Sequence, residues 1–126
     1  MHRRTDKGKD LIEIEQATLD DVFSNIELPA GSLLKTDCQG ADLFVIKGAE
    51  KNLHKFDVII IESSLFKFWG DHHPDILEIM NHMKARGFVV YDFLDGIFRP
   101  LDGALGQLDV AFVQETGPYR KSSAWG

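Results

Sequence analysis

Two acidic residues, Asp37 and Glu62, each stand directly after an apolar segment, LLKT and DVIII respectively. In open α/β sheets, ligands bind beyond the carboxyl ends of the strands. If the two segments pair as parallel strands about 4.8 Å apart, their carboxylates share one rim of the sheet. Such a pair can bind a polar ligand, bind a metal ion or accept a proton. The structural alternative is that Asp37 only caps the next helix or closes a turn.

A tight turn follows Asp37. Gly40 allows the chain to turn sharply into the next helix and allows the backbone to approach a ligand. Cys38 is the single cysteine of the chain and lies in the same turn. A nucleophilic role for Cys38 requires an activating base, and no histidine is placed by the sequence to serve as one.

The segment after Glu62 holds two further candidates. The aromatic run from Phe66 to Trp69 is either a lip over a ligand or a loop that folds its rings into the core. The segment DHHPD contains residue types that bind metals, but adjacent histidines point apart and no other ligand lies at helical spacing. We therefore expect Asp71 or His73 to cap the following helix, and we predict no metal site.

Hydrophobic patterning predicts strands that alternate with helices. Strands are expected at residues 11–16, 33–37, 56–63, 88–94 and 108–115, and helices at 18–25, 41–54 and 74–87. The apolar run Val58–Ile61 indicates a strand buried on both faces. Alternation of this kind predicts an open, mostly parallel α/β sheet. The final strand follows a glycine-rich excursion, residues 95–107, so we expect it to run antiparallel.

The composition fits one domain, residues 11–116, with a flexible N-terminus at 1–10 and a polar tail at 117–126. The net charge of −6 argues against general binding to nucleic acid or to an anionic membrane, because both depend on clustered basic residues. The single cysteine fits a reducing compartment, and no apolar run approaches the ~18 residues of a membrane span. We expect a cytoplasmic location.

Several stretches carry a family resemblance. Four stretches resemble the FkbM family of S-adenosylmethionine-dependent methyltransferases: TLDDVF, LLKTDCQGADLFVIKGAE, DVIIIESSLFKFW and RPLDGALGQLDVAFVQ. The resemblance implies a class I methyltransferase (Rossmann-like) sheet, in which residues 33–37 begin the fourth strand and residues 108–115 form the antiparallel seventh strand. The family's cofactor loop, D-x-G-A-N-x-G, has no counterpart in this sequence. We therefore expect a partial sheet, the truncated C-terminal half of the family domain.

The resemblance also implies roles for individual residues. Asp37 matches the aspartate that ends the fourth strand, where cofactor and acceptor meet, and is the candidate proton acceptor. Gln39 and Gly40 match the turn after it, which is expected to contact S-adenosylmethionine together with Asp37. Four side chains are expected on the acceptor side: Asp42, which stands where the family has glutamate, Glu62, Phe66 and Trp69.

The implied activity is O-methylation of a small hydroxyl-bearing molecule. A truncated domain without the glycine loop is expected to be inactive alone. The cofactor implied by the resemblance is S-adenosylmethionine, and the alternative is that this chain binds none. The alternative is a non-catalytic binding or assembly module built on half of the fold. Either way, half a sheet exposes a strand edge at residues 33–37, and such edges pair with other chains. We expect a homo-oligomer, or a cover formed by the strand at 11–16.

Overall fold

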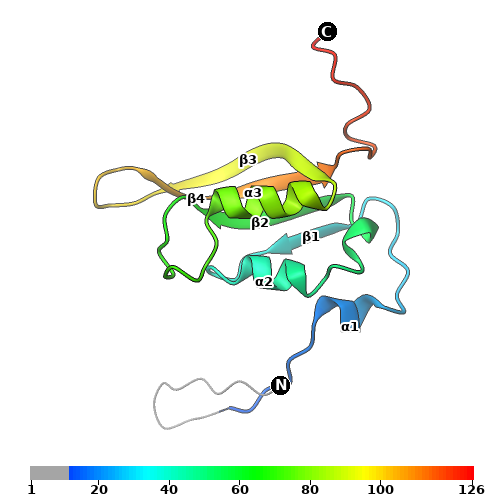
Figure 1. Cartoon of the computed structure of the whole chain (residues 1–126), viewed down its shortest axis with the longest axis horizontal. Helices are drawn as coiled ribbons and strands as arrows, with labels where there is room; N and C mark the ends of the chain where they lie inside the picture. The colour runs from blue at the N-terminus through cyan, green and yellow to red at the C-terminus, as the bar shows by residue number, and fades with distance from the viewer. Residues whose placement is uncertain (1–11) are drawn as a thin grey trace.

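The computed structural model describes residues 12–126, and Figure 1 shows its helices and strands. The chain alternates helices and strands and ends in a long β-hairpin, so the α/β class is confirmed. The helices are α1 (Leu19–Phe23), α2 (Asp42–Lys47), a 3₁₀ helix (Leu53–Lys55) and α3 (Ile76–Ala85). The strands are β1 (Leu33–Thr36), β2 (Val58–Ser64), β3 (Phe88–Phe98) and β4 (Leu105–Gln114).

The strands form one open sheet in the order β1-β2-β4-β3. β1 and β2 are parallel, whereas β4 is antiparallel to both β2 and β3. The antiparallel direction of the final strand is therefore confirmed. The prediction of a mostly parallel sheet is wrong, because β4 enters the sheet between β2 and β3 and makes both of its ladders antiparallel.

β3 and β4 are longer than expected, because much of the glycine-rich segment 95–107 extends the two strands instead of forming a loop. The turn between them is closed by a hydrogen bond of 2.8 Å from Arg99 N–H to the carbonyl oxygen of Ala104. Gly103 occupies this turn with φ +73°, which glycine adopts without steric cost. A turn this short requires the two strands to run antiparallel.

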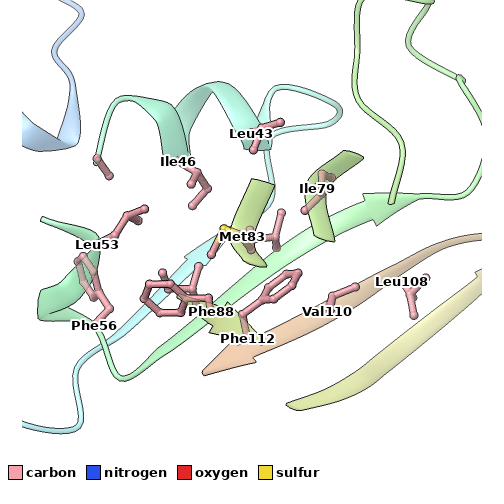
Figure 2. Close-up of a cluster of buried hydrophobic side chains, with 13 residues drawn as sticks. Leu43, Ile46, Leu53, Phe56, Ile79, Met83, Phe88, Leu108, Val110 and Phe112 are labelled. Carbon is pink, nitrogen blue, oxygen red and sulfur yellow. The ribbon is translucent and has the colours of Figure 1, made fainter. Parts of the chain in front are cut away.

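One hydrophobic core lies between the sheet and the helices α2 and α3, which pack on the same face (Figure 1). Figure 2 shows the side chains of both helices pointing toward those of β2, β3 and β4. On the face that the helical spacing turns inward, the fully buried side chains are Leu43, Ile46, Leu53, Ile79 and Met83, whereas Ile76 and Met80 are only partly buried. On the opposite face of β2, Val58 and Ile60 keep intermediate exposure. β2 is thus fully buried on one face only, and the prediction of burial on both faces is wrong.

The helix boundaries follow local capping. Asp75 caps α3 through a 3.0 Å bond from the Glu78 N–H, and Glu78 reciprocates at the N–H of Asp75. The expected cap, Asp71 or His73, is therefore wrong, because Asp75 stands directly before the first helical residue. The helix expected over residues 41–54 ends at Lys47, since Gly48 follows it as the C-cap and glycine is a poor helix former.

The N-terminal part differs from the prediction. Residues 12–16 form no strand, so the strand expected at 11–16 is wrong over these residues; Leu11 and the segment 1–10 lie outside the described residues. Within residues 12–126, β1 has only β2 as a neighbour, so its other edge is free there. Homo-oligomerisation through that edge stays a prediction. No helix in this described range has the length and apolar character needed to cross a membrane.

Candidate functional site

Asp37, which follows β1, and Glu62, which lies near the end of β2, are neighbours in the sheet. In the parallel ladder, Leu33 is opposite Val58 and Thr36 is opposite Ile61. The residues that come next in this register are Asp37 and Glu62. Asp37 directly follows the last residue of β1, whereas Glu62 lies within β2, two residues before its end at Ser64. Both are thus near the carboxyl ends of parallel strands, where open α/β sheets bind ligands.

The carboxyl groups of this pair share a hydrogen bond. The bond from protonated Glu62 to Asp37, partial burial and repulsion from the neighbouring carboxylates together raise the pKa of Glu62 to about 7. The repelling groups are Asp37, Asp42 and Asp109. A carboxyl group with a pKa near neutrality is present in both its protonated and its ionised form at physiological pH, whereas an ordinary glutamate is almost entirely ionised there.

Two more carboxylates lie near enough to act on Glu62 through their charge. Asp42, the first residue of α2, is only 2% exposed. Its Oδ1 accepts a 3.1 Å hydrogen bond from the Cys38 N–H, whereas its Oδ2 is buried without a partner. Asp109 lies opposite Glu62 in the β2–β4 ladder. Lys35 approaches Asp109 with an N–O distance of 3.5 Å, so one cation offsets part of this negative charge.

The turn after Asp37 is held in place by an aromatic loop. Gln39 and Gly40 both adopt positive φ, +49° and +92°. The ring of Trp69 lies against Gly40 so closely that an added Cβ would stand 2.5 Å from its Cγ. His73 donates a 2.8 Å hydrogen bond from Nδ1 to the carbonyl oxygen of Gly40. The segment after β2 is therefore attached to the turn after β1.

A cavity of about 810 Å³ opens on the other side of this turn. Its lining includes Cys38 and Gln39 from the turn, Phe44 from α2, and Thr18 and Leu19 at the start of α1. Small-molecule sites typically measure about 300–1,000 Å³, so the size suits a nucleoside-sized ligand. The rim of carboxylates and this cavity are thus separated only by the turn at residues 37–41.

The comparisons with known proteins decide the family. The model of the methyltransferase FkbM domain matches residues 2–90, which is 89 of the 126 residues. The chain belongs to the FkbM methyltransferase family. No curated protein and no solved structure matches this FkbM chain. The match ends at residue 90, so the expected likeness of β4 to the family's last strand stays a prediction, as does the limitation to the C-terminal half.

Most of the candidate site residues of the FkbM chain lie around one turn, residues 37–41. Asp37, Glu62 and Asp42 form the acidic rim, and Gln39, Gly40 and Trp69 build the turn beside it. Phe66 lies elsewhere: its ring stacks 4.0 Å from the Arg99 guanidinium on the β3–β4 hairpin. The roles given to these residues stay predictions, because their positions alone do not test them.

Sequence reasoning missed Asp109 and the bond from His73 to Gly40. An acid inside the strand LDVAFVQ was a visible signal, but its place beside Glu62 depends on β4 entering the sheet next to β2. Nothing in the sequence indicated the contact of His73. The side chain of His82 is only 10% exposed, and its Nε2 lies 3.2 Å from Glu50 Oε1. Among residues 12–126, no group of three acids, histidines or cysteines is arranged to hold a metal ion.

Proposed function

We propose that the acidic rim serves methyl transfer to a hydroxyl group of a small molecule. The support is the family of the chain together with one observation, the pair formed by Asp37, directly after β1, and Glu62, two residues before the end of β2. A hydroxyl group must lose its proton as its oxygen attacks a methyl group. Asp37 is the proposed proton acceptor, and Glu62 shares the proton with it.

The residues near the rim fit the cofactor of the family. S-adenosylmethionine, when bound, supplies an electrophilic methyl group on a sulfonium sulfur. We propose that Gln39 holds its nucleoside part in the 810 Å³ cavity, where apolar walls from Leu19 and Phe44 suit a flat ring. The sequence contains no D-x-G-A-N-x-G loop, so we expect this chain to bind the cofactor weakly and to turn over slowly or not at all alone.

In the proposed reaction a methyl group moves to the acceptor, and the chain's own carboxyl groups take up the proton that the acceptor loses. The acceptor oxygen forms a bond to the methyl carbon, the bond from that carbon to sulfur breaks, and its electron pair stays on sulfur. The hydroxyl proton passes to the Asp37–Glu62 pair. Because the pKa of Glu62 is about 7, the pair can hold this proton and then release it to water at neutral pH. Trp69, fixed over Gly40, covers the turn beside the pair.

Calorimetry with S-adenosylmethionine tests the proposal. We expect saturable binding to the wild-type protein and its loss in Gln39→Ala, which removes the side chain from the cavity. Asp37→Asn is expected to retain binding but to abolish any transfer of a labelled methyl group to a hydroxyl acceptor. The control is Glu115→Gln, which removes one negative charge from an exposed ion pair with Lys84 at the far end of β4. Equal binding by wild type and Gln39→Ala would overturn the cavity assignment.

A second candidate is a non-catalytic binding or assembly module. The observation that favours it is the position of Trp69, whose ring fills the space next to Gly40 where a cofactor was expected to approach the backbone. Calorimetry separates the two functions. If neither the wild-type protein nor a Trp69→Ala variant gives any heat with S-adenosylmethionine, methyl transfer is ruled out for this chain and the module is supported.

A further inference from the structure

We propose that His73 is a ligand-binding residue of the 810 Å³ cavity, where its Nε2 accepts a hydrogen bond from an uncharged nucleoside. This role rests on the proposed function, in which the cavity holds the nucleoside part of S-adenosylmethionine. It adds the side chain and the atom that recognise that part, and it uses a histidine to which the proposed reaction gives no task. None of the carboxylates near Asp37 takes part in it.

His73 is held in one place by contacts of its backbone and of its ring. Its backbone N–H donates a 3.1 Å hydrogen bond to the carbonyl oxygen of Gly70, and its own carbonyl oxygen accepts a 3.0 Å bond from Lys67 Nζ. The ring donates from Nδ1 to the carbonyl oxygen of Gly40 at 2.8 Å. The ring also meets Phe44 edge-on, with 6.0 Å between the ring centroids. A side chain fixed in this way loses little freedom when a ligand binds, so its contacts contribute more of their energy to affinity.

The bond to Gly40 sets the tautomer of the His73 ring. A carbonyl oxygen only accepts, so Nδ1 carries the proton, and in the neutral ring Nε2 is then a hydrogen-bond acceptor. Within residues 12–126, no group donates to Nε2, and this atom is not among the buried unpartnered atoms. His73 therefore presents an accessible acceptor without a protein partner in that range, and the residue lines the cavity.

The walls of the cavity that His73 lines suit an uncharged ligand. Among its described lining residues none is an aspartate, glutamate, lysine or arginine, so a phosphate or carboxylate group finds no counter-charge there. Leu19 and Phe44 give apolar walls, and the amides of Gln16 and Gln39 add polar groups. Apolar walls with a few polar groups are typical of small-molecule sites. A nucleoside combines a flat ring with hydroxyl and amino donors, and Nε2 supplies an acceptor for one of these donors.

A purely structural role for His73 predicts different behaviour, and one substitution separates the two roles. The side-chain amide nitrogen of asparagine takes the place of Nδ1, so His73→Asn keeps a donor for Gly40 and loses the acceptor at Nε2. The matched control is His72→Asn, because His72 is the preceding residue, is exposed and lines a different groove.

The test is an NMR titration of the ¹⁵N-labelled full chain with adenosine at about pH 7.5. We expect saturable shifts of the Gln39 side-chain amide and of the Phe44 backbone amide in the wild type. His73→Asn should weaken binding of adenosine about five-fold, as expected for loss of one uncharged hydrogen bond, and His72→Asn should leave it unchanged. An unchanged affinity in His73→Asn, or equal losses in both variants, would overturn the proposal.

Analogues that lack single donors identify the group that Nε2 binds. The 2′-, 3′- and 5′-deoxyadenosines each lack one hydroxyl group, and purine riboside lacks the amino group. One of these analogues should bind the wild type about five-fold more weakly than adenosine and should be insensitive to His73→Asn, because the two changes remove the same bond. Equal affinities of adenosine and all the analogues for the wild type would overturn the proposal, and this comparison stands even if a variant fails to fold.

Two further titrations separate this role of His73 from the proposed function. Adenosine 5′-monophosphate should bind no more tightly than adenosine, and tighter binding would overturn the uncharged class of ligand. Absence of binding by both adenosine and S-adenosylmethionine would overturn the cavity assignment and the role of His73 together. If both molecules bind wild type and His73→Asn equally well, only the role of His73 is refuted and the proposed methyl transfer stands.

Discussion

The substitution Glu62→Gln should remove a pH dependence from the stability of the protein. In the fold, the hydrogen bond to Asp37, burial and the nearby carboxylates raise the pKa of Glu62 from 4.5 to about 7. A carboxyl group with a raised pKa binds its proton more tightly in the folded state than in the unfolded state. Its stabilising contribution is therefore present below pH 4.5 and is lost as the pH rises through about 7.

The size of the effect follows from the same pKa. At about 1.36 kcal/mol for each unit of pKa, the change from 4.5 to about 7 sets an upper limit of about 3.4 kcal/mol. Glu62 is only partly buried, so solvent screens the charges around it. We therefore expect the free energy of unfolding to fall by about 1–2 kcal/mol more in the wild type than in Glu62→Gln between pH 4.5 and pH 8.

Urea denaturation at pH 4.5, 6, 7 and 8 measures this difference directly. The charges that face Glu62 are Asp37, Asp42 and Asp109, with Lys35 beside Asp109, and they are the same in both proteins. Glu115→Gln is the control, because its carboxylate pairs with Lys84 in an exposed position away from the Asp37–Glu62 pair. A difference between wild type and Glu62→Gln that is constant across this pH range would refute the close carboxyl pair.

Three further predictions concern stability and are checked by thermal or urea unfolding. Gly40→Ala should cost at least about 2 kcal/mol, because the new Cβ would stand 2.5 Å from the Trp69 ring at a φ of +92°. Gly31→Ala, with φ +82° but open space, is its control and should cost only about 1 kcal/mol. Asp75→Ala should cost about 1 kcal/mol through loss of the α3 cap. Met83→Ala should cost about 2–5 kcal/mol, since its side chain is fully buried in the core. Losses below about 0.5 kcal/mol would contradict each of these explanations.

The sequence predicted the acidic pair because the pair depends on local and nearest-neighbour features. Apolar runs mark β1 and β2, and the helical segment between them favours parallel pairing, so Asp37 and Glu62 had to meet if the two strands were adjacent. The inward face of α3 could also be predicted from the sequence, since the spacing of Ile79 and Met83 fixes it without knowledge of the rest of the fold.

Other features depend on contacts between distant segments, which one sequence does not reveal. The position of β4 between β2 and β3 is a choice among several strand orders, and it alone brings Asp109 to Glu62. The burial of Asp42 depends on how α2 packs, and the contact of Trp69 with Gly40 depends on the path of a loop without regular structure. Alternating residues at 12–16 resembled a strand, but in the described part of the chain they are not part of the four-stranded sheet.

The central place of β4 has a consequence for how the chain reaches its native state. β4 is synthesised after the other three strands of the sheet, yet it lies between β2 and β3. Until residues 105–114 are available, β3 has no partner for its backbone groups and the side chains of Val110 and Phe112 are missing from the interior. Nascent chains that stop short of β4 should therefore be protease-sensitive, and assembly of the sheet should occur late during synthesis.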